Sequence, residues 1–272
     1  MVNSYTAKSL KEALELRKNP ELIPYAGGTD LMVHPNENAE YLFLHKVPQM
    51  KKIVQDDKYI RFGAACTFTE IITDPIAPQI LKDACLQIAA PAIRNAGTIG
   101  GNIGNGSAKA DSALIFMVTN SKLLLRSASE DRIVSLKDFY LGRKKLDLKP
   151  DELIVEILMP RQNLKKYHYR KVSPRSALAI SRISFAGIIS LIDGKIENFA
   201  TAFGAVADVI IRPDDIDSMF IGKTVKDATQ IKDEYIKAMG KAIVPIRGRV
   251  SEEYRKAVAM NLLADFVKAC GI

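Results

Sequence analysis

Two glycine pairs, each set among hydroxyl, amide or carboxylate side chains, are the residues of this sequence best suited to ligand binding. The first lies in segment 26–31 (Ala-Gly-Gly-Thr-Asp-Leu) and the second in segment 98–106 (Thr-Ile-Gly-Gly-Asn-Ile-Gly-Asn-Gly). Glycine reaches positive φ angles at little steric cost, so consecutive backbone N–H groups can converge on one point and bind an anion. We therefore expect both loops to bind a phosphate-bearing ligand, with Asp30 or Asp111 as an acceptor for ribose or ring donors.

Neither loop matches a standard nucleotide-binding motif. Gly100-Gly101 continues as Asn102-Ile103-Gly104, which departs from G-x-G-x-x-G, and Lys109 stands where the third glycine of a motif starting at Gly104 would lie. The departures from G-x-G-x-x-G disfavour a Rossmann domain. No Walker A motif is present, which disfavours a P-loop NTPase. A single glycine pair can also be a tight turn, but two pairs with such neighbours favour binding.

The sequence gives little sign of a metal site or of acid–base catalysis. The three cysteines, Cys66, Cys85 and Cys270, have no two-residue spacing, and the three histidines do not form a His-Glu-x-x-His motif. No Cys/His or Ser/His/Asp arrangement is recognisable. We therefore expect no metal ligand and no catalytic side chain in this chain.

Composition and charge limit the classes of protein to which this chain can belong. The 272 residues, of which 47% are hydrophobic and 26% charged, suit one large or two smaller globular domains. The net charge of +8 invites nucleic-acid binding, but the basic residues are spread along the chain, so we expect none. No apolar run reaches about 18 residues and the start does not read as a secretory signal, so we expect a cytoplasmic protein without a membrane segment.

Hydrophobic periodicity predicts a small α/β unit at the start of the chain. A helix is expected over residues 7–18, ending at Asn19-Pro20 because proline cannot continue a helix interior. Further on, Thr67 and Glu70 match a capping box, and another helix is expected over residues 76–90. Strands are expected at 22–25, 41–44, 52–54, 59–63, 123–125, 133–134 and 153–158. Pro160, which ends the last of them, is the expected domain boundary.

The chain beyond Pro160 is expected to be a hairpin followed by helices. Alternation in segment 161–175 suits a strand, and the runs 183–192 and 196–206 are joined by Asp193-Gly194, which favours a type I′ turn. Helices are expected over 227–239 and 252–268. In the second, a stripe at every fourth residue predicts the buried face: Tyr254, Val258, Leu262, Phe266 and Cys270.

The two glycine loops and several later segments resemble the FAD-binding (medium) subunit of the molybdenum hydroxylases. This family includes the flavin subunits or domains of xanthine dehydrogenase, carbon monoxide dehydrogenase and nicotinate dehydrogenase. Segments Ala26 to Leu31 and Arg94 to Asn102 carry the resemblance, which spans nearly the whole chain. Its later landmarks are residues 151–154, 169–172, 179–180 and 204–207, and Ser251-x-x-Tyr254-Arg255.

The resemblance implies an α+β fold in two domains. Residues 1–160 would be a two-part FAD-binding domain of the vanillyl-alcohol-oxidase (PCMH) type, with subdomains of about 1–55 and 56–160. Residues 164–272 would be a smaller C-terminal α/β domain of the carbon monoxide dehydrogenase flavoprotein type.

The resemblance also implies FAD as the cofactor and assigns residues to it. The two loops would hold the FAD diphosphate, Asp111 the adenosine or diphosphate half, Lys171 a position near the flavin, and Ile154 a backbone contact. The cofactor-binding residues are then Ala26, Gly27, Gly28, Thr29, Asp30, Leu31, Thr98, Ile99, Gly100, Gly101, Asn102, Asp111, Ile154 and Lys171. Two positions depart from the family pattern: Ala92 replaces a frequent glutamine, and Lys109 replaces a small or polar residue and would add its charge to the diphosphate.

The function implied is that of an oxidoreductase subunit that transfers electrons. A large partner subunit would hold the molybdenum cofactor, and a small partner would pass electrons from iron–sulfur clusters to FAD, which delivers them to NAD or another acceptor. Two alternatives remain open: a free-standing FAD oxidoreductase and a non-catalytic scaffold subunit of the same fold.

Overall fold

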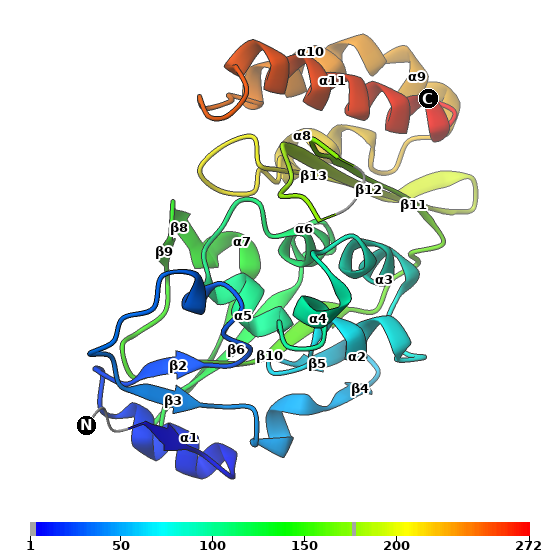
Figure 1. The fold of residues 1–272 in the computed structure, drawn as a ribbon. Coiled ribbons are helices and arrows are strands. Elements are labelled where there is room, and N and C mark those ends of the chain that lie inside the picture. Colours follow the sequence, from blue (N-terminus) through cyan, green and yellow to red (C-terminus); the bar gives the residue numbers. More distant parts are fainter. Residues whose placement is uncertain (1–3, 176–177) are drawn as a thin grey trace.

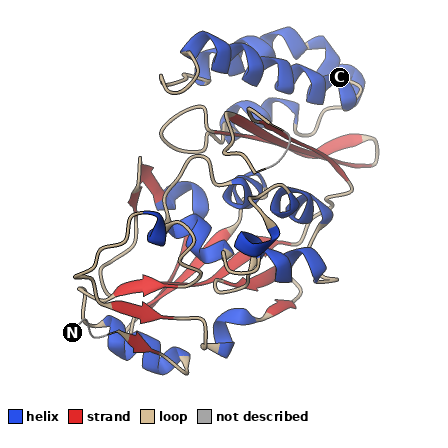
Figure 2. Ribbon diagram, in the orientation of Figure 1, coloured by secondary structure: helices blue, strands red, loops and turns tan. Residues whose placement is uncertain are grey.

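The computed structural model describes residues 4–175 and 178–272, which form three β-sheets, a two-stranded ribbon and the helices that cover them. Figure 1 shows a larger part built by the chain up to strand β10 and a smaller part, above it, built from strand β11 to the C-terminus. Figure 2 shows helices and strands mixed in both parts. The α+β class expected from the resemblance is therefore confirmed.

The chain begins with a small parallel sheet in the order β1-β3-β2. Its elements are β1 (Tyr5–Thr6), α1 (Leu10–Arg17), β2 (Ile23–Tyr25) and β3 (Tyr41–Phe43), with 3-10 helices at Leu31–Val33 and Pro48–Lys51. Ser9 caps α1 by accepting a hydrogen bond from the N–H of Glu12, and Asn19-Pro20 lies just past its end, as predicted. The first glycine loop follows β2 directly.

A five-stranded antiparallel sheet forms the centre of the larger part, in the order β4-β5-β10-β6-β7. Its strands are β4 (Ile53–Gln55), β5 (Tyr59–Gly63), β6 (Lys122–Arg126), β7 (Asp131–Ser135) and β10 (Leu153–Pro160). The last strand lies between β5 and β6, so it ties together two segments that are far apart in the sequence.

The helices of the larger part connect β5 to β6 and contain the second glycine loop. They are α2 (Phe68–Thr73), α3 (Gln79–Leu86), α4 (Pro91–Arg94), α5 (Ile99–Gly104) and α6 (Asp111–Val118), followed after β7 by α7 (Leu136–Phe139) and the ribbon β8 (Tyr140–Gly142) and β9 (Lys145–Leu146). The capping box of Thr67 and Glu70 is confirmed. The single helix expected over 76–90 is wrong at its end, because Ala89 takes a φ of 43° and Pro91 starts a new helix.

The smaller part is an antiparallel sheet covered by helices on the side away from the larger part (Figure 1). Its elements are β11 (Lys166–Val172), β12 (Ile183–Ile192), β13 (Lys195–Gly204), α8 (Asp214–Asp217), a 3-10 helix (Ser218–Phe220), α9 (Val225–Gln230), α10 (Lys232–Ala242) and α11 (Glu252–Ala269). Asp193 and Gly194 have φ angles of 49° and 75°, which confirms the predicted type I′ turn between β12 and β13.

The side chains of β12 point alternately into the hydrophobic cores of the two parts. Ala186 and Ile188 belong to the core of the larger part, whereas Phe185 and Ile189 belong to the core under α10 and α11. Helix α6, whose eight residues are all buried, packs on β12 and β13. Residues 113–118 of this helix are all apolar, and a helical segment that is apolar on every side requires such burial.

Two helical expectations are corrected at the C-terminal end. The helix expected over 227–239 is two helices that meet at Ile231. In α11 the buried face contains Arg255, Ala259, Leu263, Phe266 and Val267, whereas Tyr254 is 45% exposed. A strict four-residue spacing turns about 40° past a full turn of a 3.6-residue helix at each step, so Tyr254, at one end of the predicted stripe, leaves the buried face. Phe266 is buried as predicted, and Val258, Leu262 and Cys270 are partly buried and pack against the same core.

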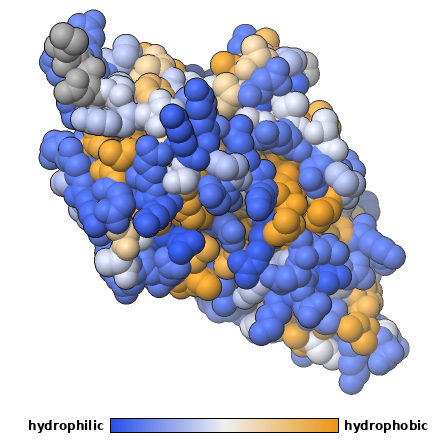
Figure 3. Space-filling model, turned by 90° about the horizontal axis from the view of Figure 1, so that it is seen from below, coloured by the Kyte–Doolittle hydropathy of each residue, from blue (hydrophilic) through white to orange (hydrophobic). Residues whose placement is uncertain are grey.

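Hydrophobic side chains on the face seen from below form several separate patches among hydrophilic ones (Figure 3). No helix within residues 4–175 and 178–272 combines the length and the apolar character that crossing a bilayer requires.

Candidate cofactor site

The two glycine loops, although some seventy residues apart, border one cavity of about 900 Å³. Thirteen of the fourteen residues expected at the cofactor line it. Ile99 is the exception: its side chain is fully buried in the core of the larger part. The structure therefore brings together nearly all the residues that were named from sequence.

The first loop touches the backbone of residues 96–97, just before the second loop. A Cβ atom on Gly27 would lie 1.9 Å from the carbonyl oxygen of Ala96, so only glycine allows this approach. Gly28 has a φ of 67°, and a Cβ atom there would lie 2.0 Å from the hydroxyl of Tyr25. The first pair thus needs glycine for both reasons that the sequence suggested, a left-handed backbone and a close approach.

The first loop presents free backbone donors. Among the hydrogen bonds of the described residues, none has the N–H of Gly27, Gly28, Thr29 or Asp30 as its donor. These consecutive residues line the cavity and are only partly buried or exposed. Consecutive N–H groups without acceptors among the described residues are what an anion requires, so the backbone of this loop is available for the predicted nest.

The second loop differs from the expectation of a second nest. The N–H of Ile99 donates to the carbonyl of Cys66 at 3.0 Å, and that of Gly100 to the carbonyl of Ala64 at 2.9 Å. The N–H of Gly101 donates to the hydroxyl of Thr98 at 3.1 Å. The backbone of this loop is therefore used to start α5 and to fix it against the central sheet.

The glycines of the second loop serve close packing instead. A Cβ atom on Gly100 would lie 2.5 Å from that of Ala64, whereas one on Gly101 would meet only the Thr98 hydroxyl, at 2.9 Å. The Asn102 side chain accepts a hydrogen bond from the Ser112 hydroxyl at 2.6 Å through Oδ1, and its amide nitrogen has no acceptor among the described residues. This loop therefore offers a flat surface at Gly101 and a side-chain donor at Asn102.

Asp111 and Lys171 form a buried ion pair in the cavity wall. Lys171 Nζ lies 2.7 Å from Asp111 Oδ2, and both side chains are 6% exposed. The Ser181 hydroxyl donates to the other carboxylate oxygen at 2.7 Å. Burial raises the pKa of Asp111 above its usual value, while the charge and hydrogen bond of Lys171 oppose that shift. The pair joins α6 to β11 and so holds the two parts of the molecule together at the cavity.

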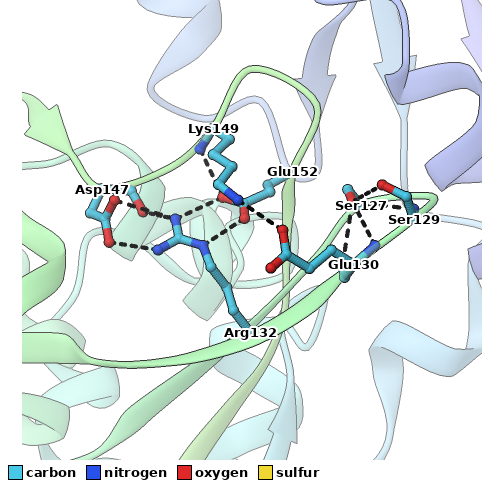
Figure 4. A network of polar contacts seen from close by, with 7 residues as sticks. All are labelled: Ser127, Ser129, Glu130, Arg132, Asp147, Lys149 and Glu152. Carbon is cyan, nitrogen blue, oxygen red and sulfur yellow. Dashed lines mark hydrogen bonds and ion pairs between the residues drawn. The ribbon is translucent and has the colours of Figure 1, made fainter.

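Ile154 lies at the start of β10, where a network of charged side chains fixes the preceding loop (Figure 4). Both oxygens of the buried Glu152 accept hydrogen bonds from Arg132, at 2.6 and 2.8 Å, and Arg132 also bonds Asp147. Burial raises the pKa of Glu152, but the hydrogen bonds from Arg132 and from the backbone N–H of Lys149 outweigh it and leave the pKa below its usual value. Glu152 and Ile154 both line the cavity, so this network shapes one of its walls.

Several lining residues were not expected from the sequence. They include Arg17, residues 88–90 and residues 178–181. Arg17 hydrogen-bonds the Leu22 carbonyl at 2.8 Å and so fixes the end of α1 near the first loop. Residues 179–180 are a landmark of the family resemblance, although no cofactor role was expected for them, whereas no local motif marks Arg17 or residues 88–90.

Within the described residues, no group of three His, Cys, Asp or Glu side chains is arranged to hold a metal ion.

The chain matches two protein-family models. Residues 1–162 match the FAD binding domain in molybdopterin dehydrogenase, and residues 168–270 match the CO dehydrogenase flavoprotein C-terminal domain.

Individual proteins are similar over most of their length. The chain is 33% identical over 220 residues to the xanthine dehydrogenase FAD-binding subunit of Escherichia coli O157:H7, covering 76% of this chain and 75% of that protein. It is 28% identical over 214 residues to the nicotinate dehydrogenase FAD-subunit of Eubacterium barkeri, covering 74% and 72%. Reconstituted CO dehydrogenase from Oligotropha carboxidovorans has a chain of the same fold, with a TM-score of 0.89, 22% identity and coverage of 99% and 98%.

Proposed function

This chain belongs to the family of FAD-binding subunits of the molybdenum hydroxylases, and on that premise we propose that it carries electrons from an iron–sulfur partner subunit through FAD to NAD or another acceptor. FAD is its cofactor, and its enzyme class is the oxidoreductases. The observation that supports the proposal most directly is the cavity of about 900 Å³ bordered by both glycine loops, where the N–H groups of residues 27–30 have no acceptor in the described part of the chain.

The residues of the first loop suit the FAD diphosphate. Four consecutive N–H groups without protein acceptors can donate to phosphate oxygens, and the absence of a Cβ atom at Gly27 and Gly28 lets the backbone come close. In this proposal Ala26, Thr29, Asp30 and Leu31 complete the loop around the diphosphate.

The second loop has a different task in this proposal. Because the N–H groups of Ile99 and Gly100 already have protein acceptors, the loop binds FAD through the exposed surface of Gly101, the Thr98 side and the amide nitrogen of Asn102. Ile99 does not contact FAD through its side chain in this proposal, because that side chain is buried and fixes the loop to the core.

The part of the cavity wall that contains Asp111, Lys171 and Ile154 suits the orientation of a ring system. Asp111 and Lys171 place an acceptor and a donor within hydrogen-bonding distance of each other at the cavity, and Ile154 adds an apolar surface. Bound FAD would supply the redox chemistry, because a flavin can take up electrons singly and release them in pairs. The side chains of this wall would bind and orient it and exclude water.

Partner subunits complete the proposal. A small subunit with iron–sulfur clusters would deliver electrons, and a large subunit with the molybdenum cofactor would oxidise the substrate. The family membership supports this arrangement, and the division into an FAD-binding domain over residues 1–160 and a C-terminal domain over 164–272 belongs to the same proposal.

The test is flavin retention combined with recovery of partners. We expect the purified chain, after addition of FAD and desalting, to keep a flavin absorption spectrum, and FAD at a hundred times its Kd to stabilise the fold by about 2.7 kcal/mol. A tagged chain from its own host should copurify with a molybdenum-containing and an iron–sulfur subunit. A chain that emerges alone and without flavin from both experiments would contradict the proposal.

A further inference from the structure

Residues 87–90, between α3 and α4, form a strained turn at the cavity, which we call the Ala89 turn. Pro91 restricts the residue before it to an extended backbone, which Ala90 adopts. Ala89 reverses the chain with a φ of 43°, in the left-handed region that alanine rarely occupies. Residues 88–90 line the cavity. Strained backbone is concentrated at functional sites, so we looked for a function of this turn.

Two cationic side chains hold the carbonyl groups of the Ala89 turn. Arg94 Nη1 donates to the carbonyl of Ile88 at 2.8 Å and to that of Ala89 at 2.9 Å. Lys171 Nζ donates to the carbonyl of Gln87 at 2.9 Å. Successive carbonyls of the turn therefore have cationic donors, which stabilise its left-handed residue.

Two N–H groups of the turn have no acceptor. Among the hydrogen bonds of the described residues, none has the N–H of Ala89 or Ala90 as its donor. The N–H of Ile88, by contrast, donates to the Cys85 carbonyl at 3.1 Å. Both alanines are half-buried. The turn thus keeps two adjacent backbone donors available at the cavity.

The two available N–H groups face away from Arg94. The Ile88 carbonyl and the Ala89 N–H belong to one peptide group, and the Ala89 carbonyl and the Ala90 N–H belong to the next. In a trans peptide the C=O and N–H bonds point in opposite directions. Both carbonyls point at the guanidinium, which does not line the cavity, whereas residues 88–90 do. The N–H groups are therefore directed to the cavity side of the turn.

Arg94 also makes these N–H groups better donors. A hydrogen bond to the carbonyl oxygen polarises the whole peptide group and strengthens the bond that its N–H can make, by about 10–30% per bond. Arg94 binds the carbonyls of the two peptide groups whose N–H groups lack an acceptor. It can thus act on a ligand in the cavity without touching it.

The surroundings of the turn favour an uncharged acceptor. The side chains of Ile88 and Ile93 line the cavity beside the two donors. Both cations that contact the turn, Arg94 and Lys171, are already bound to its carbonyls. A pair of N–H donors among apolar side chains suits the edge of a planar heterocycle, whose ring atoms accept hydrogen bonds and whose faces are apolar.

We propose that the N–H groups of Ala89 and Ala90 donate to acceptor atoms on the edge of a ring system of bound FAD, with Arg94 as the positioning residue. The inference rests on the proposed function, because it assigns these donors to FAD. It separates the donors from those of the first glycine loop, which suit the diphosphate. FAD has two ring systems with acceptors on their edges, adenine and isoalloxazine, and the experiment distinguishes them.

The experiment removes one N–H group at a time from the full chain. Cell-free synthesis with lactic acid, the α-hydroxy analogue of alanine, replaces the N–H of Ala89 or of Ala90 by an ester oxygen and leaves the side chain unchanged. The Kd for FAD is measured by flavin fluorescence, and the stability of the FAD-free chain by urea unfolding. We expect each ester to raise the Kd by about tenfold, since one hydrogen bond to FAD is lost.

Lactic acid at Ala92 is the matched control. The N–H of Ala92 also has no acceptor among the described residues, and the Pro91 carbonyl, which the ester weakens, also accepts a hydrogen bond, from the N–H of Asn95. Ala92 is exposed and does not line the cavity. Its ester should leave the Kd unchanged and should affect stability as much as the other two. Equal Kd values for the three esters would overturn the inference.

ADP and FMN, which each contain one ring system of FAD, identify the ring. Esters that weaken the binding of ADP but not of FMN assign the donors to adenine. Weaker binding of FMN but not of ADP, with a shift of the flavin absorption band, assigns them to isoalloxazine. Esters that leave the affinity for both fragments and for FAD unchanged would overturn the inference alone. An unmodified chain that binds no FAD would instead contradict the proposed function.

Arg94 has its own test. Arg94→Met should weaken the binding of the same fragment as the esters, and Arg94→Lys, which keeps a cationic donor, should restore most of the affinity. A role in folding alone would lower stability and weaken the binding of both fragments by the same factor. That result would overturn the assignment of Arg94 as a positioning residue.

Discussion

The ammonium group of Lys171 lies 2.7 Å from the carboxylate of Asp111, although the two residues are 60 positions apart in the sequence. Lys171 is on β11, in the smaller part, and Asp111 begins α6, in the larger part. The same ammonium group donates to the Gln87 carbonyl at 2.9 Å. One buried ion pair in the cavity wall therefore links both parts of the molecule.

Replacing Lys171 by methionine should destabilise the protein strongly. The substitution leaves the Asp111 carboxylate buried without its counter-charge, which typically costs about 3–5 kcal/mol. The double variant Lys171→Met/Asp111→Asn should recover part of this loss, because no unpaired charge remains. Urea unfolding of the wild type and the three variants measures the coupling. Additive effects of the two single substitutions would show that the pair is not coupled.

Gly101→Ala should separate FAD binding from stability. Its Cβ atom would meet only the Thr98 hydroxyl and would otherwise stand in the cavity. Because alanine favours the helix by up to about 1 kcal/mol, the free energy of unfolding should change by no more than about that amount. The Kd for FAD, measured by flavin fluorescence, should rise.

Two further glycine variants serve as comparisons for Gly101→Ala. Gly27→Ala should impair both properties, since its Cβ atom would lie 1.9 Å from a backbone oxygen. Gly240→Ala, in α10 and with no neighbour closer than 3.9 Å, should impair neither. Unchanged FAD affinity in Gly101→Ala would argue that the flat surface of the second loop does not face the cofactor.

Arg132→Ala should weaken the wall around Ile154. It removes both hydrogen bonds to the buried Glu152 and leaves that carboxylate without its cation (Figure 4). We expect a loss of about 3 kcal/mol in the free energy of unfolding and weaker FAD binding. Lys149→Ala, which breaks only the exposed pair with Glu130, should leave both quantities nearly unchanged. Similar losses in the two variants would contradict the importance of burial in this network.

The sequence predicted most of the fold and of the candidate site because both depend on strong local signals. The Asp193-Gly194 turn and the Thr67 capping box are read from two to four residues, and the glycine loops from two short motifs. Errors arose where tertiary packing decides. The backbone of Ile99 and Gly100 is used by Ala64 and Cys66, a contact that no spacing within the loop reveals.

The ion pairs show the same limit. The sequence predicts Asp111 and Lys171 as separate cofactor contacts, and only the pairing of β11 with β12, on which α6 packs, brings them together.

Asp217 should make stability depend on pH between about 4 and 6. Its carboxylate, 1% exposed, accepts hydrogen bonds from Arg212, Thr201 and Tyr235, yet burial raises its pKa to about 6. A carboxyl group with a raised pKa in the folded state stabilises the fold below its ordinary pKa of about 4, and this contribution is lost as the pH rises through the folded value.

The measurement is the difference in the free energy of unfolding between the wild type and Asp217→Asn, taken from urea unfolding at pH 4 and at pH 7. A shift of about two units corresponds to about 3 kcal/mol, so the difference should fall by up to that amount as the pH rises. Taking the difference removes the opposite trend of exposed carboxylates such as Asp56, whose pKa is lowered to about 2 by hydrogen bonds from Arg61. A difference that stays constant or grows with pH would mean that Arg212 keeps Asp217 ionised throughout, and that the cost of burying the carboxylate is fully offset by the ion pair.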